Sequence, residues 1–225
     1  NLLFRKSAAL HRSIPQEQTL HKNGHIPGEH VSGNKNLILV GHLRRTDCSL
    51  VSDGAAAVVL ASSDTARSMK QAVRFRSAVQ VNDYLPMSKR DIIAFEGPRL
   101  ASQKTLTQSD ISLSDLSFVE THDCFTTAEL IEYEGMGLTP PGRDAQAIEE
   151  GWTEMDGRLP VNPSDGLKAK GHPSAQPVYP CTPYAPCNFW LQHGGGQVPG
   201  AELAGLFNMG GAAVANFASI LECLR

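Results

Sequence analysis

Three short strings in this sequence combine residue types that can carry out acyl-transfer chemistry. The string "THDCF" places His122 and Cys124 where a strand is expected to pass into a helix, and the glycine-rich string "NPSDGLKAKGHP" delivers His172. The string "FNMGG" contains Asn208 and a glycine turn that can present free backbone N–H groups. An imidazole, a thiol and backbone amides can act as base, proton donor or nucleophile, and oxyanion stabiliser.

Each string also has a purely structural alternative. A single cysteine such as Cys124 is more often a small buried apolar residue than a catalyst. His172 stands before a proline and can simply cap a turn, and "FNMGG" can be a hairpin turn with Asn208 in a left-handed conformation. The individual strings are therefore weak signals, and their order along the chain has to carry the argument.

Strands and helices are expected to alternate along the chain. Apolar or alternating runs predict strands at 36–41, 53–62, 72–81, within 114–123, and at 203–211 and 212–224. Helical spacing and cap residues predict helices at 62–71, 94–112, 125–138 and 142–151. This pattern predicts an α/β layered fold with a mixed sheet of the five-stranded type and covering helices.

Several details of this fold follow from single residues. Run 53–62 is rich in Ala and Val and is expected to be buried on both faces. Pro98 suits the first turn of its helix, and Gly137 is expected to end the helix at 125–138. The last two strands are expected to form an antiparallel hairpin at the end of the sheet. This architecture needs a crossover helix between the strand within 114–123 and the final pair, and the natural place for it begins at the "GHP" string.

Composition restricts the classes of function. The net charge of −3 provides no basic surplus for binding a nucleic-acid backbone, so no nucleic-acid partner is expected. No apolar run is long enough for a membrane span, and the first thirty residues lack the apolar core of a signal peptide. We expect a cytoplasmic protein, if bacterial, or one of an organelle matrix.

The spacing of the cysteines and histidines does not predict a metal site. The five cysteines are odd in number and form no CxxC pair, which argues against a disulfide framework or a zinc site and favours a reducing compartment. Four histidines lie within residues 1–36, without acidic or thiol partners at ligand spacing. We interpret that region as a polar loop and predict no metal.

Four strings in fixed order resemble the thiolase superfamily, and more closely its sterol-carrier-protein-type thiolases. The resemblance covers most of the chain from about residue 34 onward, and its strings are "LRRTDCSLVSDGAAAVVLAS" (43–62), "VETHDCFTTAELIEYEGMGL" (119–138), "GWTEMDGRLPVNPSDGLKAKGHP" (151–173) and "GGQVPGAELAGLFNMGGAAVANFASIL" (195–221). It implies an irregular remnant at 1–36, the end of the amino-terminal thiolase half at 37–71 and the carboxyl-terminal thiolase domain at 72–225.

The resemblance also implies roles for individual residues. His172 would deprotonate a nucleophilic cysteine and polarise the thioester carbonyl, and Cys124 would shuttle the proton at the α-carbon. His122 would position a water or the substrate oxygen. Many thiolases have Cys-x-Gly in the last loop, where this chain has Asn208 and Gly210, and the Gly210 N–H could still stabilise an oxyanion. The implied substrates are acyl-CoA and coenzyme A, with no permanently bound cofactor and a homodimer in the full-length enzyme.

The sequence departs from the family in lacking the nucleophilic cysteine. That residue belongs to an amino-terminal half that this chain does not contain, and Cys48 in "TDCSL" matches a different segment. We therefore expect a carboxyl-terminal portion of a thiolase, doubtful in activity by itself. The alternatives are a non-catalytic half-domain used for dimerisation or lipid binding, and a cysteine hydrolase using Cys124 with His172.

A second departure is the segment 174–193, where Pro177, Pro180, Pro183 and Pro186 exclude an α-helix. When the codons after Pro173 are shifted by one nucleotide, they permit Ile-Gly-Ala-Thr-Gly and then a proline-free amphipathic helix, as the family has. A compensated frameshift is the hypothesis, and a genuine proline-rich insertion that recruits a partner domain is its rival. In either case we predict no regular helix at 174–190.

Overall fold

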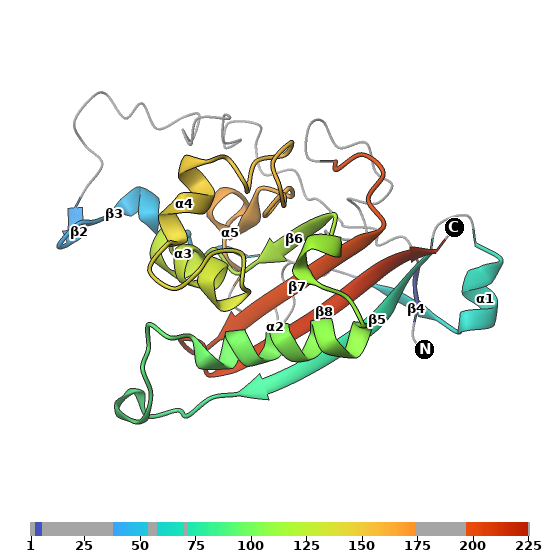
Figure 1. Ribbon diagram of the computed structural model, residues 1–225, viewed down its shortest axis with the longest axis horizontal. Helices are drawn as coiled ribbons and strands as arrows, with labels where there is room; N and C mark the ends of the chain where they lie inside the picture. The colour runs from blue at the N-terminus through green and yellow to red at the C-terminus, as the bar shows by residue number, and fades with distance from the viewer. Residues whose placement is uncertain (1–2, 6–37, 54–57, 70–71, 174–196, 225) are drawn as a thin grey trace.

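The computed structural model describes residues 3–5, 38–53, 58–69, 72–173 and 197–224. These residues form a mixed α/β structure around one six-stranded sheet with the order β4-β1-β5-β8-β7-β6 (Figure 1). The strands of this sheet are β1 (Leu3–Arg5), β4 (Val59–Ala61), β5 (Ala72–Asn82), β6 (Phe118–Thr121), β7 (Leu203–Gly210) and β8 (Ala215–Leu224). The strands β2 (Ile38–Val40) and β3 (Leu43–Arg44) form a separate pair.

The centre of the sheet consists of long strands that run in alternating directions. Strand β8 pairs antiparallel with β5 on one side and with β7 on the other, and β6 adds to β7 in parallel. The predicted mixed α/β fold is confirmed, with six strands in place of five. The hairpin β7–β8 forms as predicted, but it lies in the interior of the sheet because each of its strands takes a further neighbour.

The described helices are α1 (Ser63–Arg67), α2 (Glu96–Ser109), α3 (Thr126–Gly135), α4 (Asp144–Glu149) and α5 (Gly166–Lys170). Pro98 lies in the first turn of α2, and Gly137, with a φ of +84°, follows the end of α3, as predicted. Ser62 caps α1 by accepting a hydrogen bond from the Thr65 N–H. Among the helices in the described ranges, none is long and apolar enough to cross a membrane.

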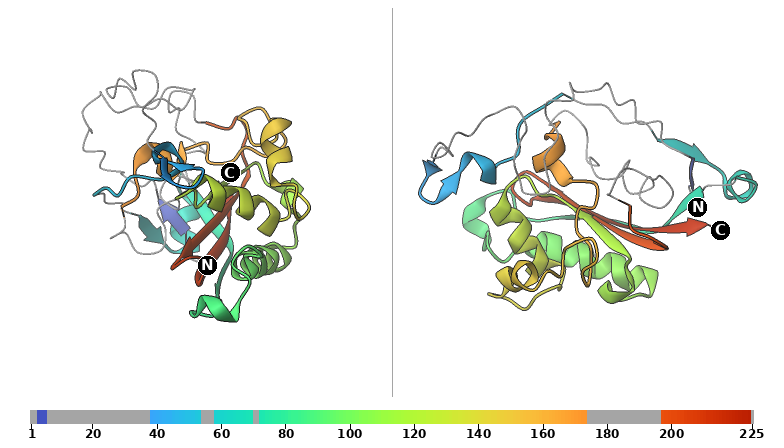
Figure 2. Two further views of the ribbon diagram at one scale, coloured as in Figure 1. Left: turned by 90° about the vertical axis from the view of Figure 1, so that its left-hand side faces the viewer. Right: turned by 90° about the horizontal axis from the view of Figure 1, so that it is seen from above.

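Two faces of the sheet carry different elements. Helices α2, α3 and α4 lie on one face, whereas α5 and the segment 38–52 lie on the other (Figure 2). The main core is formed between the sheet and α2 and α3, where Tyr133, Phe207 and Ile220 are buried together. The sheet therefore carries helices on both of its faces.

Two predictions concern the residues ahead of β5. The strand predicted at 36–41 is present as β2. The expected burial of 53–62 on both faces is wrong for the part that is described, because Val59 and Leu60 are 49% and 52% exposed. Strand β4 is an edge strand that pairs with the three-residue strand β1. Residues 54–57, the proline segment and the predicted crossover helix lie outside the described residues, as does most of 1–36.

We predict that Gly97→Ala destabilises the protein by about 1 to 3 kcal/mol, because a Cβ there clashes with Asn216. The Asn216 side chain cannot move aside cheaply, since it is buried and donates to the carbonyl of Ala213 at 2.9 Å. Urea unfolding measures the effect. Gly135→Ala is the matched control, because its Cβ meets no atom closer than 3.9 Å, and it should leave stability unchanged or raise it. Equal effects of the two variants would contradict the packing argument.

Candidate active site

The parallel pairing of β6 and β7 brings two predicted site residues together. Thr121 is the register partner of Phe207, so the next residues lie side by side, His122 just beyond the end of β6 and Asn208 within β7. Both side chains are buried, and the neighbouring Asn208 amide raises the pKa of the His122 imidazole, which opposes the effect of burial. The carboxyl ends of parallel strands are the usual location of ligand sites in α/β proteins.

The outer edge of β6 is covered by the chain around residue 162. Asn162 donates its backbone N–H to Val119 at 2.7 Å, and its side-chain oxygen accepts from the Thr121 N–H at 2.7 Å. The buried Glu120 carboxylate accepts from both the N–H and the hydroxyl of Ser164, at 3.1 and 2.6 Å. These bonds fasten the following loop to the strand that carries His122.

Asp123 fixes the helix that leads to His172. Its carboxylate accepts from the backbone N–H of Leu167 at 2.6 Å and of Lys168 at 3.3 Å, at the start of α5. Gly166 lies against this carboxylate, where an added Cβ would overlap with it. A side chain from the end of β6 therefore determines where α5 begins.

The two histidines meet in the folded structure. The ring centroids of His122 and His172 are 5.0 Å apart, with an interplanar angle of 76°. The His172 backbone donates to the carbonyl of Leu50 at 2.7 Å, and its carbonyl accepts from Ser52 at 3.2 Å. The Ser49 hydroxyl lies 3.2 Å from His172 Nδ1. Residues 49–52, which we call the bridging segment, thus hold both the backbone and the ring of His172.

The bridging segment also contacts the loop of Cys124. Ser49 donates its N–H to the Cys124 carbonyl at 2.8 Å, and Cys48 forms an antiparallel bridge with Phe125. Residues that oppose each other in such a pair project their side chains to the same side. We therefore place the Cys124 side chain on the side of Ser49, whose hydroxyl reaches His172.

Burial keeps the site histidines neutral. It lowers the pKa of His122 to about 4, an effect that the neighbouring His172 reinforces and the contact with Asn208 opposes. Burial also lowers the pKa of His172. At neutral pH the His172 imidazole is therefore an acceptor of protons.

Cys124 has the opposite electrostatic environment from a nucleophilic cysteine. Burial, followed by the charges of Glu132 and Asp123, raises the pKa of Cys124 to about 11. The thiol is therefore protonated at neutral pH, which suits a proton donor better than an attacking thiolate.

Residues that the sequence analysis missed support this arrangement. The fully buried Glu132 accepts hydrogen bonds from the Thr121 hydroxyl and the His122 N–H, and burial raises the pKa of its carboxyl. Ser49 and Glu120 were missed as well. A charged residue inside the apolar strand at 118–121 was the available signal for Glu120, whereas Glu132 looks like an ordinary polar position on a helix.

The structure brings some of the predicted site residues together more closely than others. His122, His172 and Asn208 are linked by ring or side-chain contacts, and Cys124 is linked to His172 through Ser49. Gly210 is exposed at the end of β7, two residues beyond Asn208, and its carbonyl accepts from Val214. Its role as an oxyanion donor stays a prediction.

Comparison with known families agrees with this architecture. The profile of the family described as "Thiolase C-terminal domain-like" matches residues 79–223. The chain belongs to the thiolase C-terminal domain family. The resemblance inferred from the four strings is therefore confirmed.

Two curated relatives agree with this family assignment. It is 34% identical over 171 residues to an acetyl-CoA acetyltransferase of Methanothermobacter thermautotrophicus, covering 75% of this chain and 45% of that protein. It is 34% identical over 175 residues to human sterol carrier protein 2, covering 72% of this chain and 31% of that protein. The chain therefore spans less than half the length of these relatives.

A solved structure, the Ltp2-ChsH2(DUF35) aldolase, has the same fold. It superposes with a TM-score of 0.73 at 24% identity, over 85% of this chain and 50% of that chain. At this level of identity the likeness shows the fold alone.

We predict that His122→Asn reduces the loss of stability on acidification. The pKa of His122 is about 4 in the folded state, below the value of 6.5 for an unperturbed histidine. Between these two pH values the unfolded state binds a proton that the folded state does not bind, so the free energy of unfolding falls as the pH is lowered through this window. Removing the imidazole should reduce the loss between pH 7.5 and 4.5 by about 2 kcal/mol. Urea unfolding at the two pH values measures it.

The nearby carboxyl groups of Asp123 and Glu129, whose pKa values burial raises, act in the opposite direction, so the difference between variant and wild type is the quantity to compare. The exposed His42 provides the control variant His42→Asn. An unchanged pH dependence in His122→Asn would show that the ring is not kept neutral by burial.

Proposed function

We propose that this chain is part of a thiolase-type acyltransferase that forms or cleaves a carbon–carbon bond between coenzyme A thioesters. The single observation that carries the proposal is the contact between two neutral histidines, His122 and His172, with the loop of Cys124 joined to His172 through Ser49. The family and the acetyl-CoA acetyltransferase relative support the reaction class. The proposed substrates are acyl-CoA and coenzyme A, without a resident cofactor or metal.

His172 is proposed as the base. Ser49 holds Nδ1, which leaves Nε2 of the neutral ring as the nitrogen that can take up a proton from a thiol or polarise a thioester oxygen. Its lowered pKa keeps this nitrogen unprotonated at neutral pH. The bridging segment and α5 fix the ring from both sides, which reduces the cost of orienting it in the reaction.

Cys124 and His122 are proposed to act on the other reacting atoms. A thiol that stays protonated can return a proton to the α-carbon after carbon–carbon cleavage, or take one up through a transient thiolate when a bond is formed. His122, held by Asn208 and by the bond from its N–H to Glu132, is placed to orient a water or the substrate oxygen. The Gly210 N–H is proposed as a further oxyanion donor.

The nucleophilic cysteine is proposed to come from a separate amino-terminal thiolase half. Apolar side chains are exposed next to the site, above all Val51, which is 82% exposed beside His172. Leu50 and Phe125 are exposed in the same neighbourhood. Such a surface is suited to being covered by a second half. A homodimer of the complete enzyme, in the cytoplasm or an organelle matrix, belongs to the same proposal.

We predict that the chain alone does not turn over acetyl-CoA or acetoacetyl-CoA, and that adding the amino-terminal half of the Methanothermobacter relative produces turnover. In that mixture Cys124→Ala and His172→Asn should each lower kcat by about 10² to 10⁴, the usual contribution of a positioned acid or base. Cys48→Ala removes a neighbouring half-buried thiol and is the matched control.

The outcomes separate the hypotheses. Turnover by the chain alone would contradict the proposed need for a second half. Turnover of the mixture that survives His172→Asn would contradict the role of the base. Binding of the second half without turnover would favour the alternative of a non-catalytic dimerisation or lipid-binding module.

A further inference from the structure

The turn that joins β7 to β8 has an unfavourable backbone conformation. Gly211, Ala212 and Ala213 have φ values of +61°, +54° and +65°, which is the left-handed region. This conformation is unfavourable for an L-residue with a Cβ, and two of the three residues are alanines. The turn therefore needs support from other parts of the protein.

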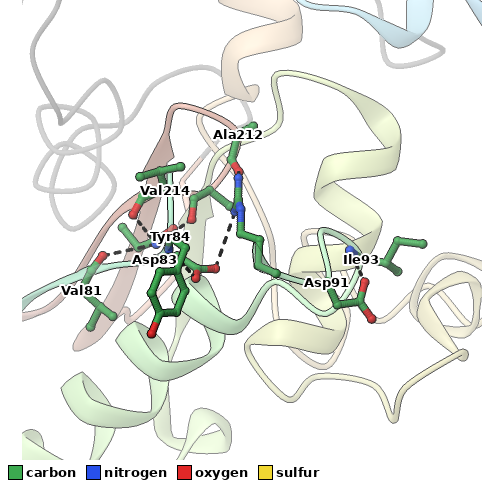
Figure 3. Close-up of polar contacts among 10 residues, drawn as sticks. Val81, Asp83, Tyr84, Asp91, Ile93, Ala212 and Val214 are labelled. Atoms are coloured by element: carbon green, nitrogen blue, oxygen red, sulfur yellow. Dashed lines mark hydrogen bonds and ion pairs between the residues drawn. The ribbon is translucent and has the colours of Figure 1, made fainter. Parts of the chain in front are cut away.

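Three successive carbonyl groups of this turn each accept a hydrogen bond. The Ala212 oxygen accepts from Arg90 Nη2 at 2.6 Å, and the Val214 oxygen accepts from the Asp83 N–H at 2.7 Å. The Ala213 oxygen accepts from the Asn216 side chain at 2.9 Å. Figure 3 shows Ala212 and Val214 facing the chain around Asp83. Two of the three donors thus come from the loop that follows β5.

Arg90 is itself fixed before it reaches the turn. Its Nη1 lies 3.6 Å from Asp83 Oδ2, and the two side chains are only 4% and 8% exposed. The other Asp83 oxygen accepts from the Tyr84 N–H at 2.7 Å. A buried ion pair is a poor source of net stability because both charges lose their hydration. Its geometry, however, holds the guanidinium at one place against the Ala212 carbonyl.

The turn is connected to the candidate site through two residues of β7. Met209 and Ala213 are buried together with Phe95, and Ala128 and Ile131 of α3 pack against them. Asn208, the neighbour of Met209, lies beside the buried His122, because the residues before them, Phe207 and Thr121, are register partners of β7 and β6. Asn208 is three residues before Gly211, so a displacement of the turn is expected to reach Asn208 along the last residues of β7.

We propose that Arg90 is a positioning residue that holds the β7–β8 turn and, through it, keeps Asn208 in contact with His122. Any consequence for catalysis rests on the proposed function, whereas the effect on the His122 ring does not. The proposal differs from a merely stabilising role, since it requires the effect of Arg90 on His122 to pass through Asn208.

The test uses the ring nitrogen signals of His122 in NMR spectra of the ¹⁵N-labelled chain. Arg90→Ala is expected to move these signals, and Arg90→Lys, which keeps the charge, should move them less. Arg99→Ala is the matched control, because Arg99 is a partly exposed arginine on α2 that pairs with Glu96 away from the turn. Its guanidinium donates to Glu96 and Gln103 of the same helix and not to the turn carbonyls, so this variant should leave the signals in place.

The decisive comparison repeats Arg90→Ala in an Asn208→Ala background. There the change at Arg90 is expected to produce little further movement of the His122 signals. Signals that do not move in Arg90→Ala, or that move equally in both backgrounds, would overturn the proposal. If Arg90→Ala does not fold, the same two criteria apply to Arg90→Lys. A failure of the proposed function would appear instead as absent turnover in the wild-type mixture, with these spectral differences intact.

Discussion

The carboxylate of Asp123 is the constraint on which the candidate site depends. It accepts from two backbone N–H groups at the start of α5 and so joins the end of β6 to the loop that ends in His172. Burial raises the pKa of this carboxyl, and the two N–H groups act against that effect by stabilising the charged form. Gly166 is required at this junction, because no Cβ fits against the carboxylate. This bond joins the segment that carries His122 to the helix that precedes His172.

Strand pairing in the sheet is a second constraint on the candidate site. Parallel pairing of β6 with β7 sets Asn208 beside His122, and the turn after β7 is held by Arg90 and Asn216. The bridging segment then closes the third side by binding Cys124 and His172. The site thus consists of several short segments, each fixed by polar bonds to its neighbours. Burial lowers the pKa of both histidines and raises the pKa of the Cys124 thiol, so the imidazoles are neutral and the thiol is protonated.

Much of the fold could be predicted from periodicity. Strand β5 alternates apolar and polar residues, Pro98 lies in the first turn of α2, and Gly137 follows the end of α3. The placement of the β7–β8 hairpin inside the sheet was not predictable in this way, because it depends on which distant strands pair with it. The exposure of Val59 and Leu60 has the same origin, since burial of a strand depends on its neighbours.

Some residues of the candidate site could be predicted from the sequence, and others could not. His122, Cys124, His172 and Asn208 stand in strings that resemble a known family, so the sequence predicts them. Glu132, Ser49 and Arg90 could not be predicted from spacing, because each acts through contacts with residues ten or more positions away, which leave no periodic pattern. Polar residues of this kind look like surface positions until the tertiary partner is known.

The most direct measurement of the central claim is the nuclear Overhauser contact between the ring protons of His122 and His172, compared between the wild-type chain and Asp123→Ala. The ring separation of 5.0 Å predicts a cross-peak in the wild type. The account predicts that this cross-peak is lost in Asp123→Ala while the β5–β8 amides keep their wild-type shifts. A cross-peak that is absent from the wild type, or that persists in the variant, would contradict it.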